Sequence, residues 1–404
     1  MRRHRTSLMF LLIRPPLGWW LRWRFRLSIH YDASMDGVRP PFLLLANHVN
    51  YWDPFLLVLA FRRPVHFLAA DGNFRSRLMR FLMHAAGAIP KAKARTDIES
   101  LRDLQRRIAE HEIVALFPEG QRTWDGASRA MLPATPKLAR LLGAPVVAVQ
   151  LRGAYLSTPR WARNLRRGRL ELHVSRILSR TELRTLPRSR IAERLARALT
   201  FDEASWQEKH GIRFVGRNRA CHAEQAVFWC PACGSWDTFS SHGNELTCAD
   251  CAYRVWFGGS GRLLAVGPSA LPGVFRMRDW NARQLNELEQ QLFDAAHGPP
   301  GPLPLRTAPL KHLIGYRSRP LRPRGTVVLE LDRRDLRLSS GLQVPVAEID
   351  GINVQFAHQL EFYAGGVLHV LRADVTGSAL QHASVYRVEQ TVLMLQDLYK
   401  VAKH

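Results

Sequence analysis

Between residues 40 and 200, short apolar runs alternate with stretches in which apolar side chains recur at helical spacing. An apolar run of this length is typical of a buried strand, and a 3.6-residue period is typical of an amphipathic helix. The expected strands are 42–46, 65–69, 112–117, 145–151 and 169–174, and the expected helices are 55–61, 74–84, one from 98, 133–142 and 190–199. Strands that alternate with helices predict an α/β domain with a mostly parallel sheet, over residues 33–205.

Local signals mark two helix ends within this domain. Residues 96–99, Thr-Asp-Ile-Glu, have the capping-box pattern that begins a helix. Gly143 follows the apolar positions of 133–142 and predicts that this helix ends there.

In sheets of this type, sites lie beyond the carboxyl ends of the strands. The segments directly after 42–46 and 112–117 are therefore the expected place for chemistry.

The C-terminal half has a different pattern. Residues 201–225 are polar and irregular and are interpreted as a linker. From 262 to 404 one helix is expected at 279–293 and a last one after Ser384, its predicted N-cap. Short β-like runs separated by turn residues are expected between them, at 326–331, 336–339, 344–346, 352–356, 360–363 and 367–372. This predicts an accessory α+β domain. The pattern resembles a pleckstrin-homology barrel, although other small barrels and unrelated α+β domains share it.

The composition is that of a globular protein with a strong positive charge. The chain has 404 residues, of which 46% are hydrophobic and 23% are charged. Lys and Arg number 58 against 34 Asp and Glu, so the formal net charge is +24. This balance predicts a polyanionic partner, either nucleic acid or an anionic membrane face. The length predicts two or three domains.

The positive charge is marked in the first 32 residues. Residues 1–31 hold seven Arg and no Asp or Glu, and Trp19, Trp20 and Trp23 alternate with some of these Arg. The apolar run 8–13 is too short to span a membrane and lacks the features of a cleavable signal peptide. Amphipathic Trp and cationic Arg suit the lipid headgroup layer. We expect residues 1–32 to contact a membrane; the alternative is an ordinary packing helix whose arginines face water.

A cysteine module occupies residues 226–258. Its two Cys-x-x-Cys pairs are separated by fourteen residues and consist of Cys230, Cys233, Cys248 and Cys251. This spacing predicts a zinc ribbon with a closed, structural four-thiolate Zn²⁺ site in a reducing compartment. A redox dithiol is the alternative, but one pair would suffice for it. Residues 228–257 hold one Arg against three acidic residues, so nucleic-acid binding by the ribbon is not expected.

The first segment with candidate chemistry is Asn47-His48-Val49-Asn50-Tyr51-Trp52-Asp53, where the strand 42–46 ends. A carboxylate beside an imidazole selects its tautomer and stabilises the imidazolium, which makes the His a competent general base. His48 and Asp53 are therefore candidates for a catalytic pair. Taken alone, one His and one Asp in a loop are more often structural.

The second segment is Phe117-Pro118-Glu119-Gly120-Gln121-Arg122, which follows the strand 112–117. Gly120 permits a sharp turn. Glu119 and Arg122 are then expected at the same strand end as His48, where Arg can bind a phosphate through two hydrogen bonds. The alternative is a plain turn with a surface ion pair.

Together these motifs resemble those of the glycerolipid acyltransferases of the 1-acylglycerol-3-phosphate type. The family's first motif is Asn-His, four residues and Asp, and its third is Phe-Pro-Glu-Gly followed by Arg. Its fourth, a proline-led apolar strand, is matched by 145–149, and its second, a glycine with an apolar stretch and a basic residue, is matched loosely by 87–91. Where the family often has Ser two residues after the His, this chain has Asn50. The resemblance covers roughly residues 20–200.

The resemblance implies acyl transfer from a thioester, either acyl-CoA or acyl carrier protein, to a hydroxyl of a lysophospholipid such as 1-acylglycerol-3-phosphate. His48, oriented by Asp53, would take the proton of that hydroxyl, with no Ser or Cys nucleophile and no catalytic cofactor. Other motif residues are expected to bind substrate, and Glu119 and Arg122 to orient its headgroup. The expected substrate-binding residues are Asn47, Glu119, Gly120, Arg122, Lys91, Lys93 and Arg95.

The expected protein is thus a membrane-associated acyltransferase with a zinc ribbon and a C-terminal accessory domain. Its partner would be membrane phospholipid, on the cytoplasmic face of a membrane, as a peripheral or monotopic protein. The sequence is also compatible with three alternatives: a non-catalytic lipid-binding scaffold, a nucleic-acid-binding zinc protein, and an acyltransferase whose acceptor is an amino-acid or glycolipid hydroxyl.

Overall fold

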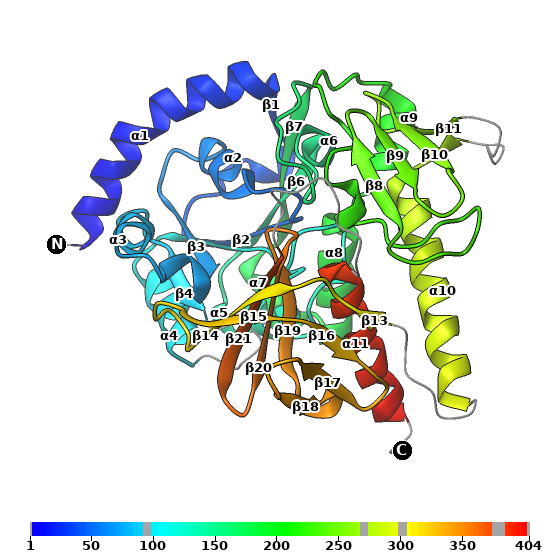
Figure 1. Ribbon diagram of the computed structural model, residues 1–404. Helices are drawn as coiled ribbons and strands as arrows, with labels where there is room; N and C mark the ends of the chain where they lie inside the picture. Colours follow the sequence, from blue (N-terminus) through cyan, green and yellow to red (C-terminus); the bar gives the residue numbers. More distant parts are fainter. Residues whose placement is uncertain (1, 92–97, 267–273, 298–304, 374–383, 402–404) are drawn as a thin grey trace. The chain divides into compact units, whose positions relative to one another are not determined.

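The computed structural model describes residues 2–91, 98–266, 274–297, 305–373 and 384–401 (Figure 1). The chain forms two compact units. The N-terminal unit comprises Met1–Arg160 and Leu165–Gly216, and the C-terminal unit comprises Trp161–Asn164 and Arg217–His404.

A seven-stranded sheet forms the centre of the N-terminal unit, in the order β1-β7-β6-β2-β5-β3-β4. Neighbouring strands are parallel except for β6 and β7, which confirms the mostly parallel sheet. The strands are β1 (Leu27–Tyr31), β2 (Phe42–Ala46), β3 (Val65–Ala70), β4 (Ile89–Lys91), β5 (Ile113–Leu116), β6 (Val146–Arg152) and β7 (Leu170–Leu178).

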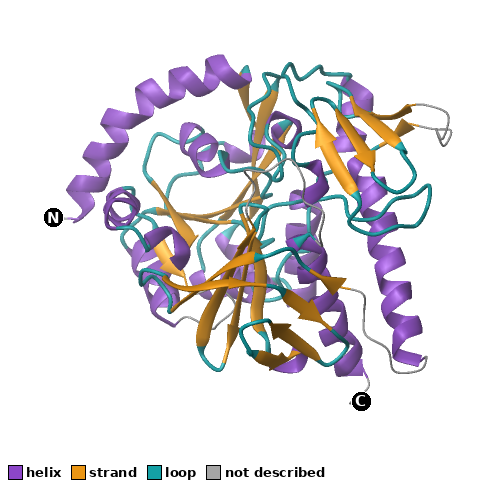
Figure 2. Cartoon of the chain, viewed as in Figure 1, coloured by secondary structure: helices purple, strands orange, loops and turns teal. Residues whose placement is uncertain are grey.

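Helices surround this sheet (Figures 1 and 2). They are α1 (Arg2–Phe25), η1 (Ala33–Met35), α2 (Asp53–Leu59), η2 (Asp71–Phe74), α3 (Arg77–Ala85), α4 (Ile98–Ala109), α5 (Thr135–Leu142), α6 (Ala154–Ser157), α7 (Arg180–Thr185), α8 (Arg188–Leu199) and α9 (Glu203–His210). Strand side chains such as Leu43 and Val146 share one buried cluster with Leu104 of α4, Ala139 of α5 and Leu195 of α8. The core therefore lies between the sheet and α4, α5 and α8.

Most predicted elements of this unit are present with boundaries shifted by a few residues. α5 ends where Gly143 adopts a left-handed conformation (φ +58°), as its sequence predicts. α4 begins at Ile98, while Thr96 and Asp97 of the predicted capping box lie outside the described residues.

The structure adds two elements that the sequence-based boundaries did not include. Residues 27–31, at the end of the segment expected to contact a membrane, form β1 and pair with β7. Residues 201–225 are not only a linker, because they contain α9, and the compact unit extends to Gly216 instead of ending at 205. The polar composition of this segment gave no helical pattern from which α9 could be predicted. The helix begins where the Asp202 side chain accepts the N–H of Ala204, and its Trp206 side chain is buried.

The described residues of the C-terminal unit form three antiparallel sheets. The cysteine module belongs to a five-stranded sheet in the order β12-β11-β10-β9-β8, and the later strands form sheets in the orders β13-β16-β17-β18 and β15-β14-β21-β20-β19. The elements are η3 (Ala223–Gln225), β8 (Phe239–His242), β9 (Glu245–Cys248), β10 (Arg254–Phe257), β11 (Leu263–Val266), β12 (Val274–Phe275), α10 (Met277–His297), β13 (Leu305–Arg306), β14 (Leu310–Gly315), β15 (Arg322–Val327), β16 (Leu329–Leu331), β17 (Asp335–Leu338), β18 (Gln343–Pro345), η4 (Val346–Glu348), β19 (Asp350–Gln355), β20 (Gln359–Ala364), β21 (Val367–Ala373) and α11 (Val385–Val401).

The predicted C-terminal helices and most of the predicted strands are confirmed, and Ser384 caps α11 by accepting the N–H of Arg387 at 3.0 Å. The single strand predicted at 326–331 is wrong, because these residues are divided between β15 and β16, which belong to different sheets. β13 and β14 were missed. The cysteine module and the strands after residue 305 lie in one compact unit, where the sequence predicted separate domains at 226–258 and 262–404. The likeness to a pleckstrin-homology barrel stays a prediction.

Candidate functional site

The loops that carry the first and third motifs lie at the same edge of the sheet. The first motif follows β2 and the third follows β5, and these two strands are parallel neighbours. The backbone N–H of His48 donates to Glu119 Oε1 at 3.0 Å, and the N–H of Thr123 donates to the carbonyl of His48, also at 3.0 Å. This confirms the expectation that the two loops meet at one site.

His48 and Asp53 form a hydrogen-bonded pair. His48 Nδ1 lies 2.8 Å from Asp53 Oδ2, which also accepts the N–H groups of Val49 at 2.6 Å and Asn50 at 2.9 Å. Asp53 opens α2 and is fully buried, whereas the His48 side chain is 20% exposed. An acceptor at Nδ1 places the ring proton there and leaves Nε2 as the basic nitrogen.

The surroundings of His48 keep its imidazole neutral. Burial lowers its pKa, the charges of Arg122 and Arg160 lower it further, and the hydrogen bond and charge of Asp53 oppose this shift. The ring also stacks on Phe117, with centroids 4.0 Å apart. Because the pKa lies below the ordinary histidine value of about 6.5, the side chain is a free base at neutral pH.

Glu119 and Asn47 face the protein backbone. The second oxygen of Glu119 accepts the N–H of Arg129 at 2.9 Å, and burial raises the pKa of this carboxyl to about 8. The buried Asn47 amide exchanges two hydrogen bonds with the backbone of Leu151 in β6, at 2.7 and 3.0 Å. This geometry favours a role in positioning the two loops over the substrate contacts predicted for both residues, which stay untested.

Arg122 lies in the same site, as predicted. Burial lowers the pKa of its guanidinium, while the nearby Asp53 and Tyr51 favour its charged form. Gly120 provides the turn before it, at φ +72°, and a Cβ on Gly120 would meet Leu132 at 3.3 Å. A half-buried guanidinium close to the His48–Asp53 pair is suited to hold an anionic group.

Arg160 is a site residue that the sequence did not reveal. It is only 4% exposed, donates to the Arg122 carbonyl at 2.7 Å, and lies over the Trp124 ring at 4.2 Å from the centroid. It follows α6, more than a hundred residues after His48, in a stretch without a motif. Only its burial against the third motif identifies it.

We expect Arg160→Gln to raise the pKa that governs the acidic limb of kcat/KM, because a cation that disfavours protonated His48 is removed. Arg160→Lys keeps the charge but loses the planar contacts with Trp124, so it should lower the rate without this shift. The measurement is the pH profile of acyl transfer for both variants. An unchanged profile in Arg160→Gln would contradict the electrostatic role.

The part of the chain that carries this site is similar to known proteins. Residues 30–152 match the model of the family described as Acyltransferase. This match covers less than half of the chain, and residues 30–152 are called the acyltransferase segment below because of that similarity. Over 102 residues it is 38% identical to the lyso-ornithine lipid O-acyltransferase of Rhizobium meliloti (strain 1021), a stretch covering 25% of this chain and 34% of that protein. The chain therefore spans about a third of the length of this curated relative.

Among solved structures, the chain is similar to the crystal structure of the 1-acyl-sn-glycerophosphate (LPA) acyltransferase PlsC from Thermotoga maritima. The TM-score is 0.40 and the sequence identity 18%, over 48% of this chain and 78% of that one.

The remaining predicted substrate contacts of the acyltransferase segment are less well placed. Lys91 ends β4, at the same sheet edge but three strands from β2, or roughly 14 Å at 4.8 Å per strand. Lys93 and Arg95 lie outside the described residues.

Glu203 of α9 supports the acyltransferase segment from its C-terminal side. It is buried, and its carboxylate accepts the N–H of Gly153 at 3.0 Å, between β6 and α6. Asn50 of the first motif donates to the next carbonyl, that of Ala154, at 2.8 Å. Burial raises the pKa of Glu203 from 4.5 to about 8. Between these values the folded protein holds a proton that the unfolded chain has released, so stability falls as pH rises through this window.

Glu203→Gln should remove part of this pH dependence, because a neutral amide oxygen can still accept the Gly153 N–H. We expect the variant to be several degrees more stable than the wild type at and above about pH 8, with a smaller difference near pH 5. Thermal unfolding across this range measures the effect, and Glu193→Gln on the exposed face of α8 is the matched control. Parallel curves for Glu203→Gln and wild type would contradict it.

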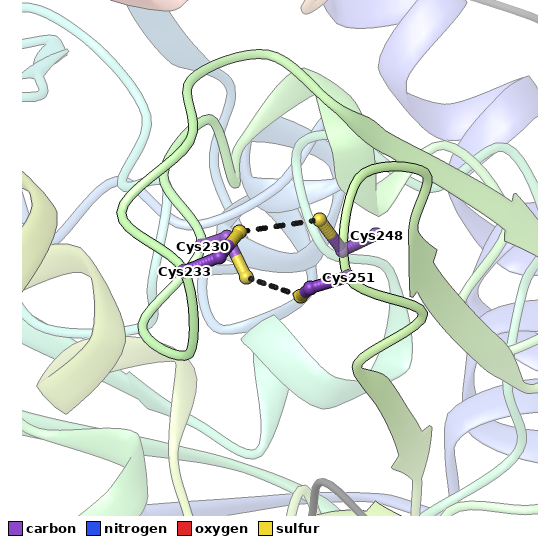
Figure 3. A group of neighbouring side chains, drawn as sticks. All are labelled: Cys230, Cys233, Cys248 and Cys251. Atoms are coloured by element: carbon purple, nitrogen blue, oxygen red, sulfur yellow. Dashed lines mark hydrogen bonds between the residues drawn. The ribbon is translucent and has the colours of Figure 1, made fainter.

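The four predicted cysteine ligands lie together in the C-terminal unit. One ligand atom of each of Cys230, Cys233, Cys248 and Cys251 falls within 4.8 Å of all the others, and Figure 3 shows the sulfur atoms of two facing turns pointing toward one another. The Cys230–Cys251 and Cys233–Cys248 sulfurs are 3.7 and 3.9 Å apart. A tetrahedral Zn²⁺ with bonds of about 2.3 Å needs sulfurs about 3.8 Å apart, so the cluster is compatible with zinc.

Proposed function

We propose that the protein is an O-acyltransferase that moves a fatty acyl group from acyl-CoA or acyl carrier protein to a hydroxyl of a lysophospholipid such as 1-acylglycerol-3-phosphate. The observation that carries this proposal is the His48–Asp53 pair at 2.8 Å, beside Arg122 and within the acyltransferase segment.

In the proposed mechanism, the acceptor hydroxyl binds near Nε2 of His48. The imidazole takes the hydroxyl proton as the oxygen attacks the thioester carbonyl, and Asp53 stabilises the imidazolium that forms. The tetrahedral intermediate then expels the thiolate, which receives the proton from the imidazolium. An ester and a free thiol result, without a covalent enzyme intermediate.

Arg122 is proposed to hold the headgroup of the acceptor. The N–H groups of its guanidinium can donate two parallel hydrogen bonds to a phosphate, which favours a lysophospholipid as the acceptor. It pairs equally well with a carboxylate, and the 38% identical relative is a lyso-ornithine lipid O-acyltransferase. The second candidate function is therefore acyl transfer to a lysolipid with an amino-acid headgroup.

The N-terminal helix is proposed to bring the site to its substrate at the cytoplasmic face of a membrane. α1 packs through the buried Leu21 and Phe25 but leaves Leu11 66%, Trp19 71% and Trp23 52% exposed. A groove of about 660 Å³ between α1 and α2 is lined by Arg14, Pro15, Trp19, Arg22, Trp23 and Leu59. Cationic and aromatic side chains at one surface suit anionic phospholipid headgroups. No helix in the described ranges is long and apolar enough to cross a bilayer.

The four cysteines are proposed to hold a structural Zn²⁺. Four thiolates close a tetrahedral site and leave no position for a substrate or water, so the ion would stabilise the fold without taking part in acyl transfer.

The deciding experiment supplies the purified full-length protein with acyl-CoA or acyl carrier protein donors and with lysophosphatidate or a lyso-ornithine lipid as acceptor. Mass spectrometry identifies the product, and His48→Ala is the control. Acylated lysophosphatidate supports the first candidate, and acylation of the amino-acid lipid alone supports the second. No transfer with any pair, together with intact binding to vesicles, would favour a non-catalytic lipid-binding scaffold.

A further inference from the structure

Three potential metal ligands gather on one face of β1 and β7, outside the motif loops. The two strands are parallel, and their register places Ser28 opposite Glu171 and His30 opposite His173. Because side chains alternate along a strand, these four share one face, and Leu172 points to the other, where it is fully buried. The sheet therefore presents two imidazoles and a carboxylate at adjacent positions.

The side chains are close enough to share one ion. The His30 and His173 rings stack with centroids 4.8 Å apart, and Glu171 Oε2 lies 3.0 Å from His173 Nε2. One ligand atom from each of the three residues lies within 4.8 Å of the other two. His30 is exposed and the His173 side chain is 33% exposed, so an ion can enter from solvent.

Neighbouring groups already restrain these side chains. Arg169 Nε pairs with the second oxygen of Glu171 at 3.0 Å, and Ser28 Oγ lies 3.1 Å from His30 Nε2. Contacts of this kind orient metal ligands in known sites. Arg152 also lies near Glu171 and His173, and its charge disfavours a cation. Ion binding must therefore rely on direct bonds to the two imidazoles and the carboxylate, because the neighbouring arginines offset the attraction of Glu171 for cations in general.

We propose that His30, Glu171 and His173 bind a divalent transition-metal ion of the Zn²⁺ type, with at least one open position for water. Two imidazoles and one carboxylate suit Zn²⁺, Cu²⁺ or Ni²⁺, whereas Mg²⁺ and Ca²⁺ prefer oxygen ligands alone. Glu171 and His173 come from one strand at i and i+2, and His30 comes from the adjacent strand, so the sheet itself sets their spacing. This site lies in the other unit from the cysteine cluster and does not depend on the proposed acyl transfer.

The test uses the untagged full-length protein, titrated with Zn²⁺ after its cysteine cluster has been saturated. The wild type should bind one further equivalent, and neither Mg²⁺ nor Ca²⁺ should displace it. Loss of a group that only orients a metal ligand lowers metal affinity roughly 10- to 100-fold. His30→Gln and His173→Gln each remove a ligand itself, so each should lower the Zn²⁺ affinity by more than this. Co²⁺ at this site should show ligand-field bands without the thiolate charge-transfer bands of the cysteine cluster.

The matched control is His111→Asn, which removes an exposed histidine elsewhere in the same unit. Asn tolerates the positive φ of +59° at that position, and the variant should bind Zn²⁺ as the wild type does. Circular dichroism and an unchanged melting temperature without metal establish that the His30 and His173 variants are folded, and Glu171→Gln provides a third ligand change. Absence of a further equivalent, or equal binding by the ligand variants and His111→Asn, would show that the three side chains form only a surface hydrogen-bond network.

Discussion

Replacement of His48 by alanine is expected to abolish acyl transfer while leaving the fold intact, with a fall in kcat of about 10³-fold or more. In the proposed mechanism the imidazole, which Asp53 orients at 2.8 Å, is the general base, and alanine cannot take the hydroxyl proton. Transfer of a labelled acyl group to the acceptor identified for the wild type measures the loss. Because the pKa of His48 is lowered, the wild-type rate should fall with decreasing pH only below the ordinary histidine value.

Asp53→Asn separates positioning from proton transfer. The amide keeps the size of the carboxylate, and its oxygen can take the place of Oδ2, which accepts the N–H groups of Val49 and Asn50. A neutral oxygen accepts these hydrogen bonds less strongly than a carboxylate does, and it cannot stabilise the imidazolium. We expect this variant to lose activity and also some stability, whereas His48→Ala loses activity alone. His111→Asn serves as the histidine control. Near-normal turnover of His48→Ala would exclude the general-base mechanism.

Loss of the proposed zinc is expected to have the largest effect on stability. Structural Zn²⁺ contributes on the order of 10 kcal/mol to the folding of small zinc modules. Cys248→Ser removes one ligand from a buried position at the end of β9, so the sheet β8–β12 should lose its metal and much of its stability. If about 5 kcal/mol is lost, the melting temperature of the C-terminal unit should drop by roughly 10–20 °C. Metal content and calorimetry measure the two effects.

Cys221→Ser is the matched control, because Cys221 lies outside the cluster and its sulfur only approaches the carbonyl of Gly243 at 3.8 Å. This variant should keep both the metal and the melting temperature. Removal of the metal by a strong chelator should reproduce the effect of Cys248→Ser in the wild type. A Cys248→Ser protein with unchanged zinc content and melting behaviour would overturn the structural-zinc proposal.

The agreement between sequence and structure is closest where chemistry depends on short spacing. The five-residue step from His48 to Asp53 and the two Cys-x-x-Cys pairs each bring their side chains together through a single turn, so local sequence is sufficient to predict them. Contacts between residues that are distant in the sequence could not be predicted from local spacing. Arg160 acts on the third motif through burial beside it, and Glu203 supports Gly153 from a segment interpreted as a linker.

The role of Glu119 shows the same limit. Its place in the third motif predicted a headgroup contact, but both of its oxygens accept backbone N–H groups, from His48 and Arg129. A carboxylate next to a glycine turn has the same sequence pattern in either role. Only the path of the neighbouring loop decides which donors it meets.

From its sequence alone, this chain is predicted to have a mostly parallel α/β sheet, two motif loops at one sheet edge, a four-cysteine cluster and a strong positive charge, because hydrophobic period, motif spacing and composition are local properties. The tertiary structure decided which strands are neighbours. It placed β1 beside β7, and so His30 beside Glu171 and His173, across more than 140 residues of sequence. Strand pairing over that distance depends on the packing of the whole core, and no local pattern in the chain encodes it.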